Sequence, residues 1–346
     1  MFEIVLTGDV NLMNVTDPQV PFGRVRDIFA KADVVFSNFE SCLYSPATRN
    51  SVRNEGFHAD PEVGGAAIHY AGIDAVGIAN NVNYGDEAIT TSVANLDALG
   101  IPHTGAGKNL AAARAPAIVK KGGLTVGFLQ RSSVYWPTNH EALPDAPGIA
   151  VIRGHTAYHV PYARLRPGMP PPNRPGVPPE IVTFADKTYL AAFAEDIAAL
   201  RPRVDVLVAS CHWGLGEEVL QYMTEIAHAA IEAGADIVMG HGPHYSLPIG
   251  IHRGKPIFYG LGNLSFHTGH GGRAHGNWLG LLVRAAAGRD GLTDVRFRFV
   301  RHNQDNETFW CDLDEEGEAL AELAGRSQPY GAKLARAGDE ITVTAT

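Results

Sequence analysis

The chain has 346 residues, of which 45% are hydrophobic and 19% are charged, as expected for a globular protein with a substantial core. Its formal net charge of −9 argues against nucleic acid as a partner, because nucleic-acid-binding surfaces are usually basic. The three cysteines form no Cys-x-x-Cys pair, which argues against a disulfide framework and fits a reduced compartment.

The chain begins with MFEIVLTGD, which is predicted to be a strand and not a signal peptide, because no basic segment precedes an apolar one. No apolar run approaches the roughly 20 residues that a transmembrane helix needs. We therefore expect no transmembrane segment and a cytoplasmic location.

The first two thirds of the chain alternates short apolar runs with amphipathic segments. The apolar runs are predicted to be buried parallel strands: Ile4–Thr7, Val34–Ser37, Ala75–Ala79, Val204–Ala209 and Asp236–Met239. The amphipathic segments predict helices: Gly23–Lys31, Asp86–Leu99, Lys187–Leu200 and Val219–Ala233. Alternation of this kind is typical of βαβ units.

Paired apolar segments joined by turns predict antiparallel hairpins. They are Ala117–Val119 with Thr125–Leu129, Ile249–Ile251 with Ile257–Tyr259, and Leu279–Ala285 with Val295–Arg301. Together with the βαβ units, these hairpins predict an α/β protein with a mixed β-sandwich core flanked by helices.

Two segments interrupt this pattern and are predicted to be surface loops that could cover a site. One is a proline-rich insertion near residues 160–180, and the other is the His- and Gly-rich loop 267–277. We expect a single catalytic domain over residues 1–311, followed by a C-terminal helix and tail over residues 312–346.

Polar clusters follow the predicted strands, at the end where α/β sheets bind ligands. Each holds an oxygen or imidazole ligand, and most carry a glycine: Gly8-Asp9, Asn38-Phe39-Glu40, Asn80-Asn81, His212-Trp213-Gly214, His241-Gly242-Pro243-His244 and Gly262-Asn263. Carboxylates combined with imidazoles suit divalent transition metals, and Glu40 could bridge two ions. The sequence therefore predicts one or two divalent ions, with Mn, Zn, Fe and Ca as candidates.

Two stretches carry a resemblance to a known family. They are HWGLGEE and IEAGADIVMGHGPHYSLPIGIHRGKPIFYGLGNLSF, and the similarity extends from Gly8 to about Phe266. The chain resembles the CapA-like family, named for capsule and poly-γ-glutamate synthesis, within the calcineurin-like metallophosphoesterase superfamily. The resemblance implies a calcineurin-like metallophosphoesterase fold over the catalytic domain.

The resemblance also implies a set of metal ligands. These are Asp9, Glu40, Asn81, His212, His241 and His244. By this similarity Asp9 and His244 would bind one ion, Glu40 would bridge, and the other three would bind the second ion.

The chain departs from the superfamily pattern at two positions. Asn11 stands where the first motif usually has a histidine, and Val82 stands where phosphoesterases have the histidine that protonates the leaving group. Valine cannot transfer a proton, and general acid–base help is worth roughly 10²–10⁴ in rate. Ordinary phosphomonoester hydrolysis is therefore disfavoured.

Other residues are candidates for proton transfer and substrate contact. Histidine is the commonest proton-transfer group near neutral pH, and the candidates in loops are His155, His267 and His270. The polar clusters also contain Asn38, Trp213 and Asn263, which we expect to contact substrate.

Three functions fit these expectations. The first is metal-assisted amide hydrolysis of a peptide-like or γ-glutamyl substrate, with a metal-activated water. The second is metal-dependent epimerisation of a peptide Cα in ribosomal peptide maturation, which needs no leaving-group acid and which the family resemblance implies as a possibility. The third is a non-catalytic module in polyglutamate or capsule assembly.

Overall fold

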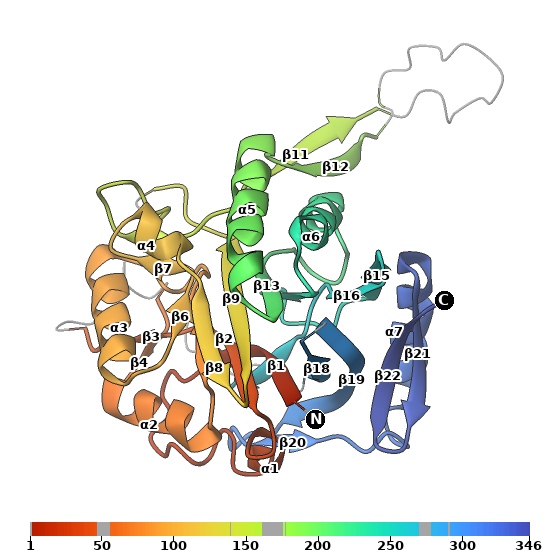
Figure 1. Cartoon of the computed structure of the whole chain (residues 1–346), viewed down its shortest axis with the longest axis horizontal. Coiled ribbons are helices and arrows are strands. Elements are labelled where there is room, and N and C mark those ends of the chain that lie inside the picture. Colours follow the sequence, from red (N-terminus) through yellow and green to blue (C-terminus); the bar gives the residue numbers. More distant parts are fainter. Residues whose placement is uncertain are drawn as a thin grey trace.

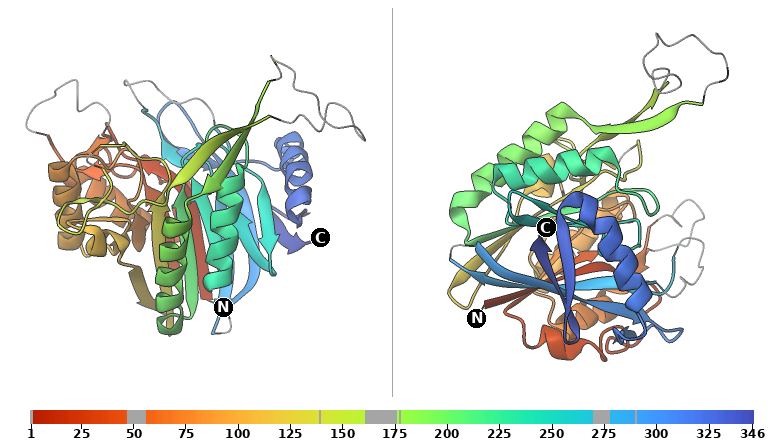
Figure 2. Two further views of the ribbon diagram at one scale, coloured as in Figure 1. Left: turned by 90° about the horizontal axis from the view of Figure 1, so that it is seen from above. Right: turned by 90° about the vertical axis from the view of Figure 1, so that its right-hand side faces the viewer.

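The computed structural model describes residues 2–46, 56–138, 140–160, 176, 178–269, 278–289 and 291–346. Two mixed β-sheets pack face to face at its centre, and helices cover both outer faces (Figures 1 and 2). The predicted α/β arrangement of mixed sheets flanked by helices is confirmed. Among the described helices, none is both long enough and apolar enough to cross a membrane.

The larger sheet has ten strands. Eight of them follow the order β21-β22-β19-β18-β1-β2-β5-β6, while β17 pairs with β1 and β20 with β19. Their bounds are β1 (Phe2–Asn11), β2 (Val34–Phe39), β5 (Ala75–Gly77), β6 (His103–Thr104), β17 (Asn263–Phe266), β18 (Gly280–Gly288), β19 (Gly291–His302), β20 (Thr308–Trp310), β21 (Ala332–Ala337) and β22 (Glu340–Ala345). The run β1-β2-β5-β6 is parallel, as predicted for βαβ units, and the strands from β18 to β21 are antiparallel.

The second sheet has six strands in the order β15-β16-β14-β13-β9-β8. Their bounds are β8 (Ala117–Lys121), β9 (Leu124–Ser132), β13 (Val206–His212), β14 (Ile237–His241), β15 (Ile249–His252) and β16 (Lys255–Phe258). The four inner strands are parallel, and β8 and β15 run antiparallel at the edges. The three predicted hairpins are confirmed as β8–β9, β15–β16 and β18–β19.

Helices and short strand pairs complete the described chain. The helices are α1 (Arg26–Phe29), α2 (Pro61–Ala71), α3 (Asp86–Ala98), α4 (Leu110–Arg114), α5 (Lys187–Leu200), α6 (Gln221–Ala233) and α7 (Gly317–Ser327). The short pairs are β3 (Cys42–Leu43) with β4 (His58–Ala59), β7 (Ala106–Gly107) with β10 (Gly148–Ile149), and β11 (Gly154–His159) with β12 (Glu180–Ala185). The β11–β12 ribbon projects from the body of the molecule (Figures 1 and 2).

Three apolar clusters hold the layers together. Between the sheets, Phe36 of β2 stacks on Phe128 of β9, with ring centroids 4.3 Å apart. Ile68 of α2 belongs to the cluster on the outer face of the larger sheet, and Ile226 of α6 to the cluster on the outer face of the second sheet. Burial of apolar surface on both faces of each sheet is what makes the strand runs almost continuously hydrophobic.

The C-terminal segment differs from the predicted helix and tail. The helix is present as α7, but the residues after it form the β21–β22 hairpin, which extends the larger sheet through β19. Ile341 of β22 is fully buried in the same core cluster as Phe297. The apolar residues of β22 alternate, which is typical of a strand with one buried face and not of a free tail.

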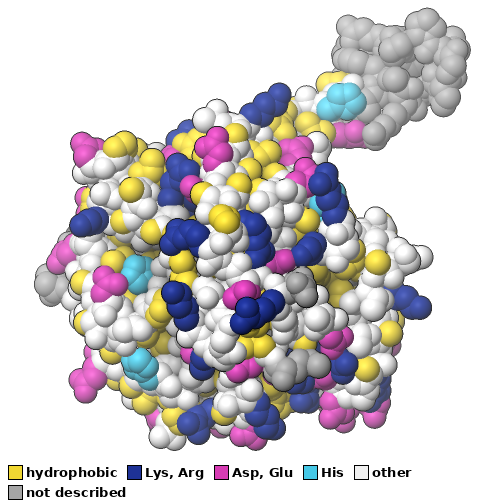
Figure 3. All heavy atoms as spheres, in the orientation of Figure 1, with side chains coloured by type: hydrophobic (Ala, Val, Ile, Leu, Met, Phe, Trp, Pro, Cys, Tyr) yellow, Lys and Arg dark blue, Asp and Glu magenta, His cyan; other side chains and the backbone are white. Residues whose placement is uncertain are grey.

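Parts of both predicted surface loops lie outside the described residues. These are 161–175 and 177 in the proline-rich insertion, and 270–277 in the His- and Gly-rich loop, which include His270. On the described part of the face in Figure 3, basic and acidic side chains are interspersed, with no large basic patch.

Candidate metal centre

The ends of parallel strands from both sheets meet at one place. Asp9 of β1 pairs with Asn38 of β2 and with Asn263 of β17, while His212 of β13 pairs with His241 of β14. The face-to-face packing of the sheets then brings the two groups of strand ends together. This is the position at which the polar clusters in the sequence predicted a site.

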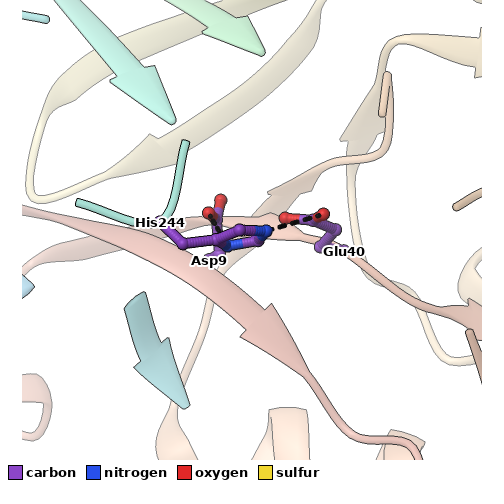
Figure 4. A group of neighbouring side chains, drawn as sticks. All are labelled: Asp9, Glu40 and His244. Atoms are coloured by element: carbon purple, nitrogen blue, oxygen red, sulfur yellow. Dashed lines mark ion pairs between the residues drawn. The ribbon is translucent and has the colours of Figure 1, made fainter. Parts of the chain in front are cut away.

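Asp9, Glu40 and His244 form the centre of this group (Figure 4). One ligand atom from each lies within 4.8 Å of the others. His244 Nδ1 lies 3.1 Å from Asp9 Oδ2, and His244 Nε2 lies 3.9 Å from Glu40 Oε1. Two carboxylates and an imidazole this close together are a donor set that suits a divalent ion.

Two further imidazoles each direct one nitrogen towards the same carboxylates. His212 Nε2 lies 3.6 Å from Glu40 Oε1, and His241 Nδ1 lies 3.8 Å from Asp9 Oδ1. Both nitrogens are buried and make no hydrogen bond. Because buried polar atoms are almost always satisfied, two such atoms beside two carboxylates indicate that the residues present fit a metal ion.

The backbone around Asp9 and His244 is held in an unusual geometry. Gly8 of β1 lies so close to the segment that leads into β17 that a Cβ there would lie 1.9 Å from the Gly262 carbonyl oxygen. Register shifts next to Asp9 in both of its parallel pairings interrupt the regular strand, as bulges beside functional sites often do. His244 has a φ of 66°, in the left-handed region, and Gly242 donates its N–H to Asp9 Oδ2 at 3.2 Å.

A layer of amide side chains orients the carboxylates. Asn38 donates from Nδ2 to Asp9 Oδ1 at 2.7 Å and to Glu40 Oε2 at 3.5 Å. Gln130 of β9 donates from Nε2 to Asn38 Oδ1 at 2.8 Å, and its Oε1 accepts from the Ala79 N–H at 2.5 Å. Partners of this kind fix the orientation of metal ligands. The structure thus places Asn38, predicted to contact substrate, in hydrogen bonds with the carboxylates.

Polar side chains also contact the three histidines, and for His212 and His241 they lie against the nitrogen that does not face a carboxylate. Ser210 Oγ lies 2.8 Å from His241 Nε2, and Ser132 Oγ lies 3.4 Å from His212 Nδ1. Asn263 Oδ1 lies 2.9 Å from His244 Nδ1. Sequence reasoning did not identify Gln130, Ser132 or Ser210 as site residues, because each lies within an apolar strand run; strand periodicity from His212 could have identified Ser210.

Burial and charge set the protonation of the cluster. Burial raises the pKa of Glu40 well above its usual value, and the neighbouring charge of Asp9 adds to the effect. Burial acts against ionisation of Asp9 as well, but the hydrogen bond and charge of His244 outweigh it and hold the pKa below its usual range. Burial lowers the pKa of His212 to about 4 and that of His241 to about 3, so both rings are neutral and able to bind metal.

His244 has the opposite shift from the other two imidazoles. Burial acts to lower the pKa of His244, but the charge of Glu40 and the hydrogen bond to Asp9 outweigh it and raise the pKa to about 9. Without a metal, the proton on His244 is the positive charge that stabilises the two buried carboxylates. A divalent ion could take over that role once this proton leaves.

The remaining predicted site residues have varied positions. Asn81 is half-buried in the loop after β5, where its backbone carbonyl accepts a hydrogen bond from Trp136 Nε1 at 2.9 Å, and its role as a ligand stays a prediction. Trp213, predicted to contact substrate, is instead fully buried, and its indole N–H donates to the Tyr259 carbonyl at 2.8 Å. The structure therefore gives Trp213 a packing role.

The candidate proton-transfer histidines are separated from one another. His155 lies on the projecting β11–β12 ribbon, where its Nε2 is 3.0 Å from Asp186 Oδ2, and so it is not part of the metal cluster. His267 directly follows Phe266, whose ring packs on His244 with centroids 4.6 Å apart. His267 Nδ1 is buried and without a hydrogen bond. His267 lines a surface pocket with Asp17 and Asp305, and its role in proton transfer stays a prediction.

The two departures from the superfamily pattern have structural explanations. Asn11 donates to the Thr268 carbonyl at 2.6 Å and accepts from the Met13 N–H at 2.8 Å, so both of its polar atoms are hydrogen-bonded to backbone. Val82 is fully buried in an apolar cluster with Phe57 and Phe266. Packed apolar side chains thus fill the position at which the sequence resemblance implied a leaving-group acid.

Comparison with known proteins identifies the family. A family model described as bacterial capsule synthesis protein PGA_cap matches residues 3–268. The chain belongs to the PGA_cap family. This confirms the predicted relationship to the CapA capsule and poly-γ-glutamate synthesis proteins.

Two relatives show how far the similarity extends along this PGA_cap protein. The uncharacterized protein y4sH of Sinorhizobium fredii is 26% identical over 309 residues, which cover 77% of this chain and 66% of that protein. A probable polyglutamine synthesis accessory protein of Mycobacterium tuberculosis is 33% identical over 194 residues, which cover 54% of this chain and 43% of that protein. The chain therefore spans less than two thirds of the length of either relative.

A solved structure shares the fold of this PGA_cap protein. It is a hypothetical protein from Thermus thermophilus, with a TM-score of 0.50 and 14% sequence identity. The similarity covers 87% of this chain and 100% of that chain. At this level of identity the match supports the two-sheet architecture alone.

Proposed function

We propose that this PGA_cap protein is a divalent-metal-dependent hydrolase of calcineurin-like fold that cleaves an amide bond in a peptide-like or γ-glutamyl substrate. The observation that carries the proposal is the pair of buried, unpartnered imidazole nitrogens, His212 Nε2 and His241 Nδ1, beside two buried carboxylates. A vestigial fold without metal gives no reason to keep polar atoms buried and unsatisfied, since each weakens stability by about 1–3 kcal/mol.

The residues that would hold the ion are present in one cluster. They are Asp9, Glu40, His212, His241 and His244, with Asn81 as the sixth ligand expected from the sequence. A bound divalent ion would lower the pKa of a coordinated water towards neutrality and polarise a substrate carbonyl. The protein's own contribution is to fix the two carboxylates through Asn38 and Gln130 and to exclude solvent from the ligands.

The choice of an amide over a phosphate ester depends on Val82. Cleavage of a phosphomonoester by the route usual in this superfamily uses an acid at that position, and here it is filled by the apolar cluster with Phe57 and Phe266. The mycobacterial relative is named a probable polyglutamine synthesis accessory protein, and the residues of such a polymer are joined by amide bonds. Both points favour an amide substrate for this chain.

Metal-dependent epimerisation is the second candidate, and His267 is the observation that favours it. Epimerisation requires one group to remove the Cα proton and another to return a proton to the opposite face. The unpartnered Nδ1 of His267, next in sequence to a ring that packs on His244, could serve as one of these groups. The same experiment distinguishes this reaction from hydrolysis.

The test is incubation of the Mn²⁺- or Zn²⁺-loaded protein with γ-glutamyl and α-linked glutamyl peptides in D₂O. Mass spectrometry and chiral amino-acid analysis would follow the products. Hydrolysis predicts new amine termini with deuterium absent from Cα, whereas epimerisation predicts deuterium at Cα of an intact peptide. Either activity should be lost in Asp9→Asn and in His212→Ala.

Each outcome has a definite meaning. Cleavage that depends on metal and on Asp9 supports the hydrolase. Exchange without cleavage replaces it with the epimerase. Full metal occupancy with neither reaction on any of the peptides would leave the non-catalytic assembly module as the function and would reject the proposal.

A further inference from the structure

The metal cluster opens to solvent beside His244. The side chains of Asp9, Glu40, His212 and His241 are 0–2% exposed, whereas the side chain of His244 is 20% exposed. A ligand that reaches the cluster from solvent must therefore pass next to the His244 ring. The groups around this ring determine which ligands fit.

Aromatic rings flank His244 and continue to the surface. The Trp278 ring lies 5.0 Å from the His244 ring, and Tyr245 stacks on Trp278 with centroids 5.6 Å apart and planes at 6°. Tyr245 is 42% exposed, so this stack extends from the metal cluster into solvent. A stacked pair whose outer ring is exposed and whose half-buried inner ring lies beside His244 offers an apolar face to an incoming ligand.

The backbone holds this aromatic pair in place before any ligand arrives. Ser246, next to Tyr245, donates from Oγ to the carbonyl of Leu279, next to Trp278, at 2.6 Å. Ser246 also forms an isolated β-bridge with Leu261, on the segment that leads into β17. A surface fixed in this way loses little conformational entropy on binding, which favours a role in recognition.

The chemistry of the pair selects the ligand group. Tyr245 and Trp278 carry no charge, so a ligand carboxylate placed against them would lose hydration without gaining an ion partner. An aromatic or aliphatic side chain would instead bury apolar surface against the rings. A homopolymer of glutamate, which has a carboxylate on every residue, is a poor match for this surface.

We propose that Tyr245 and Trp278 form a subsite for an apolar side chain of a peptide-like substrate, next to the amide bond at the metal centre. The inference rests on the proposed function and narrows its substrate class. The substrate is a γ-glutamyl or related peptide whose residue beside the reacting bond is aromatic or aliphatic.

The test compares two dipeptides that differ only in that residue. Isothermal titration of the Mn²⁺-loaded protein with γ-Glu-Phe and γ-Glu-Ala should show γ-Glu-Phe binding at least about tenfold more tightly, the ratio that about 1.4 kcal/mol of ring contact gives. Tyr245→Ala should reduce the ratio below about threefold, and Tyr245→Phe should retain it, because phenylalanine keeps the stacking ring.

A matched control uses a second exposed tyrosine. Tyr158 lies on the projecting ribbon and is 72% exposed, so Tyr158→Ala should leave both affinities unchanged. Mn²⁺ affinity should be the same in all of the variants, since none removes a proposed ligand. Trp278→Leu provides a second variant that removes the inner ring.

The proposal is overturned if the wild-type protein binds the two dipeptides equally or binds neither. It is also overturned if the preference survives in both Tyr245→Ala and Trp278→Leu. Preference without cleavage would keep the subsite and reject the hydrolase. Cleavage without preference would keep the hydrolase and reject the subsite, so the two ideas fail separately.

Discussion

At the scale of single residues, the two nitrogens of each buried histidine have different surroundings. Ser210 Oγ lies 2.8 Å from Nε2 of His241, and Ser132 Oγ lies 3.4 Å from Nδ1 of His212. The opposite nitrogens, which face Asp9 and Glu40, are left without a partner. A polar group on the far side of an imidazole fixes the ring and leaves one nitrogen directed at a metal.

Removal of either ring should therefore weaken metal binding strongly. We expect His212→Ala and His241→Ala each to lower Mn²⁺ affinity by more than about 100-fold, the upper end of what is seen when only an orienting partner is lost. Asn11→Ala is the control, because both polar atoms of Asn11 bind backbone. Isothermal titration with the three variants gives the comparison. Equal losses in all three would contradict the ligand assignment.

Gln130 links the two sheets behind the proposed metal ligands, and glycines leave room for its side chain. A Cβ at Gly77 would lie 2.5 Å from the Gln130 amide, and one at Gly105 would lie 2.8 Å from Gln130 Oε1. The amide holds Asn38, which in turn holds Asp9. Gln130 Nε2 also lies 3.2 Å from Nε2 of His241, so Gln130 is a positioning residue that acts on the metal ligands through Asn38 and through His241.

Gln130→Met keeps the volume of the side chain and removes its hydrogen bonds. We expect Mn²⁺ affinity to fall about 10–100-fold, the usual effect of losing an orienting partner. Gln221→Met is a matched control, because Gln221 is exposed on α6 and bonds only Glu225 among the described contacts. Affinity should be measured by competition with a metal-sensitive dye. An unchanged affinity in Gln130→Met, with folding intact, would reject the positioning role.

At the scale of elements, strand alternation explains the position of Trp213. Ser210 and His212 share one face of the chain at the end of β13, while Cys211 and Trp213 point to the other face and pack with α6. The two-residue period of a strand could have predicted this from the position of His212. Strand alternation therefore explains why Trp213 is buried although it follows His212 directly.

The loop after β5 shows how the position of the missing acid is filled. Trp136 donates to the Asn81 carbonyl, and His140 bonds the Asn83 carbonyl at 3.0 Å while its other nitrogen accepts from the Trp136 N–H. Burial lowers the pKa of His140 to about 4, so this ring is a neutral structural group. Trp136 and His140 thus hold the backbone of this loop by hydrogen bonds, while the Val82 side chain packs in the apolar cluster with Phe57 and Phe266.

Placing a histidine at position 82 should not produce phosphatase activity. Val82→His would place a polar ring among Phe57 and Phe266, and we expect it to lower the free energy of unfolding by about 1–3 kcal/mol. Turnover of an aryl phosphate should stay at the wild-type level. Urea unfolding and a chromogenic assay test both points. Val93→His, at a half-buried position of α3, is the control and should be milder. A tenfold gain in turnover would contradict this prediction.

At the scale of the whole molecule, the strands of the two sheets could be predicted from the sequence, whereas the side chains that orient the metal ligands could not. Apolar strand runs and hairpin turns are local signals, so the inner strands of both sheets were predictable. The helix α2 was missed, although Asp60 before Pro61 is a strong start signal; paired glycines at 64–65 weaken its periodicity. The contact between Gln130 and Asn38 joins two sheets, and no local pattern encodes such a contact.

Metal binding should stabilise the whole fold. An ion present at 100 times its dissociation constant adds about 2.7 kcal/mol of stability if it binds only the folded state. With an unfolding entropy of about 2.1 cal/mol/K per residue, this should raise Tm by roughly 4 °C. Thermal unfolding with Mn²⁺ and with EDTA gives the shift. His212→Ala should show little or none of it.

The increase in Tm caused by Mn²⁺ should also grow with pH, because His244 and Glu40 must lose protons when the ion binds. Both groups have raised pKa values without metal, that of His244 being about 9, and they must lose protons before they bind an ion. In the metal-free protein, the raised pKa of His244 contributes stability that is full below about pH 6.5 and is lost as pH rises through about 9. The difference in Tm between Mn²⁺ and EDTA should therefore be larger at pH 8 than at pH 6. Equal differences at the two pH values would show that no proton is displaced and that His244 is not a ligand.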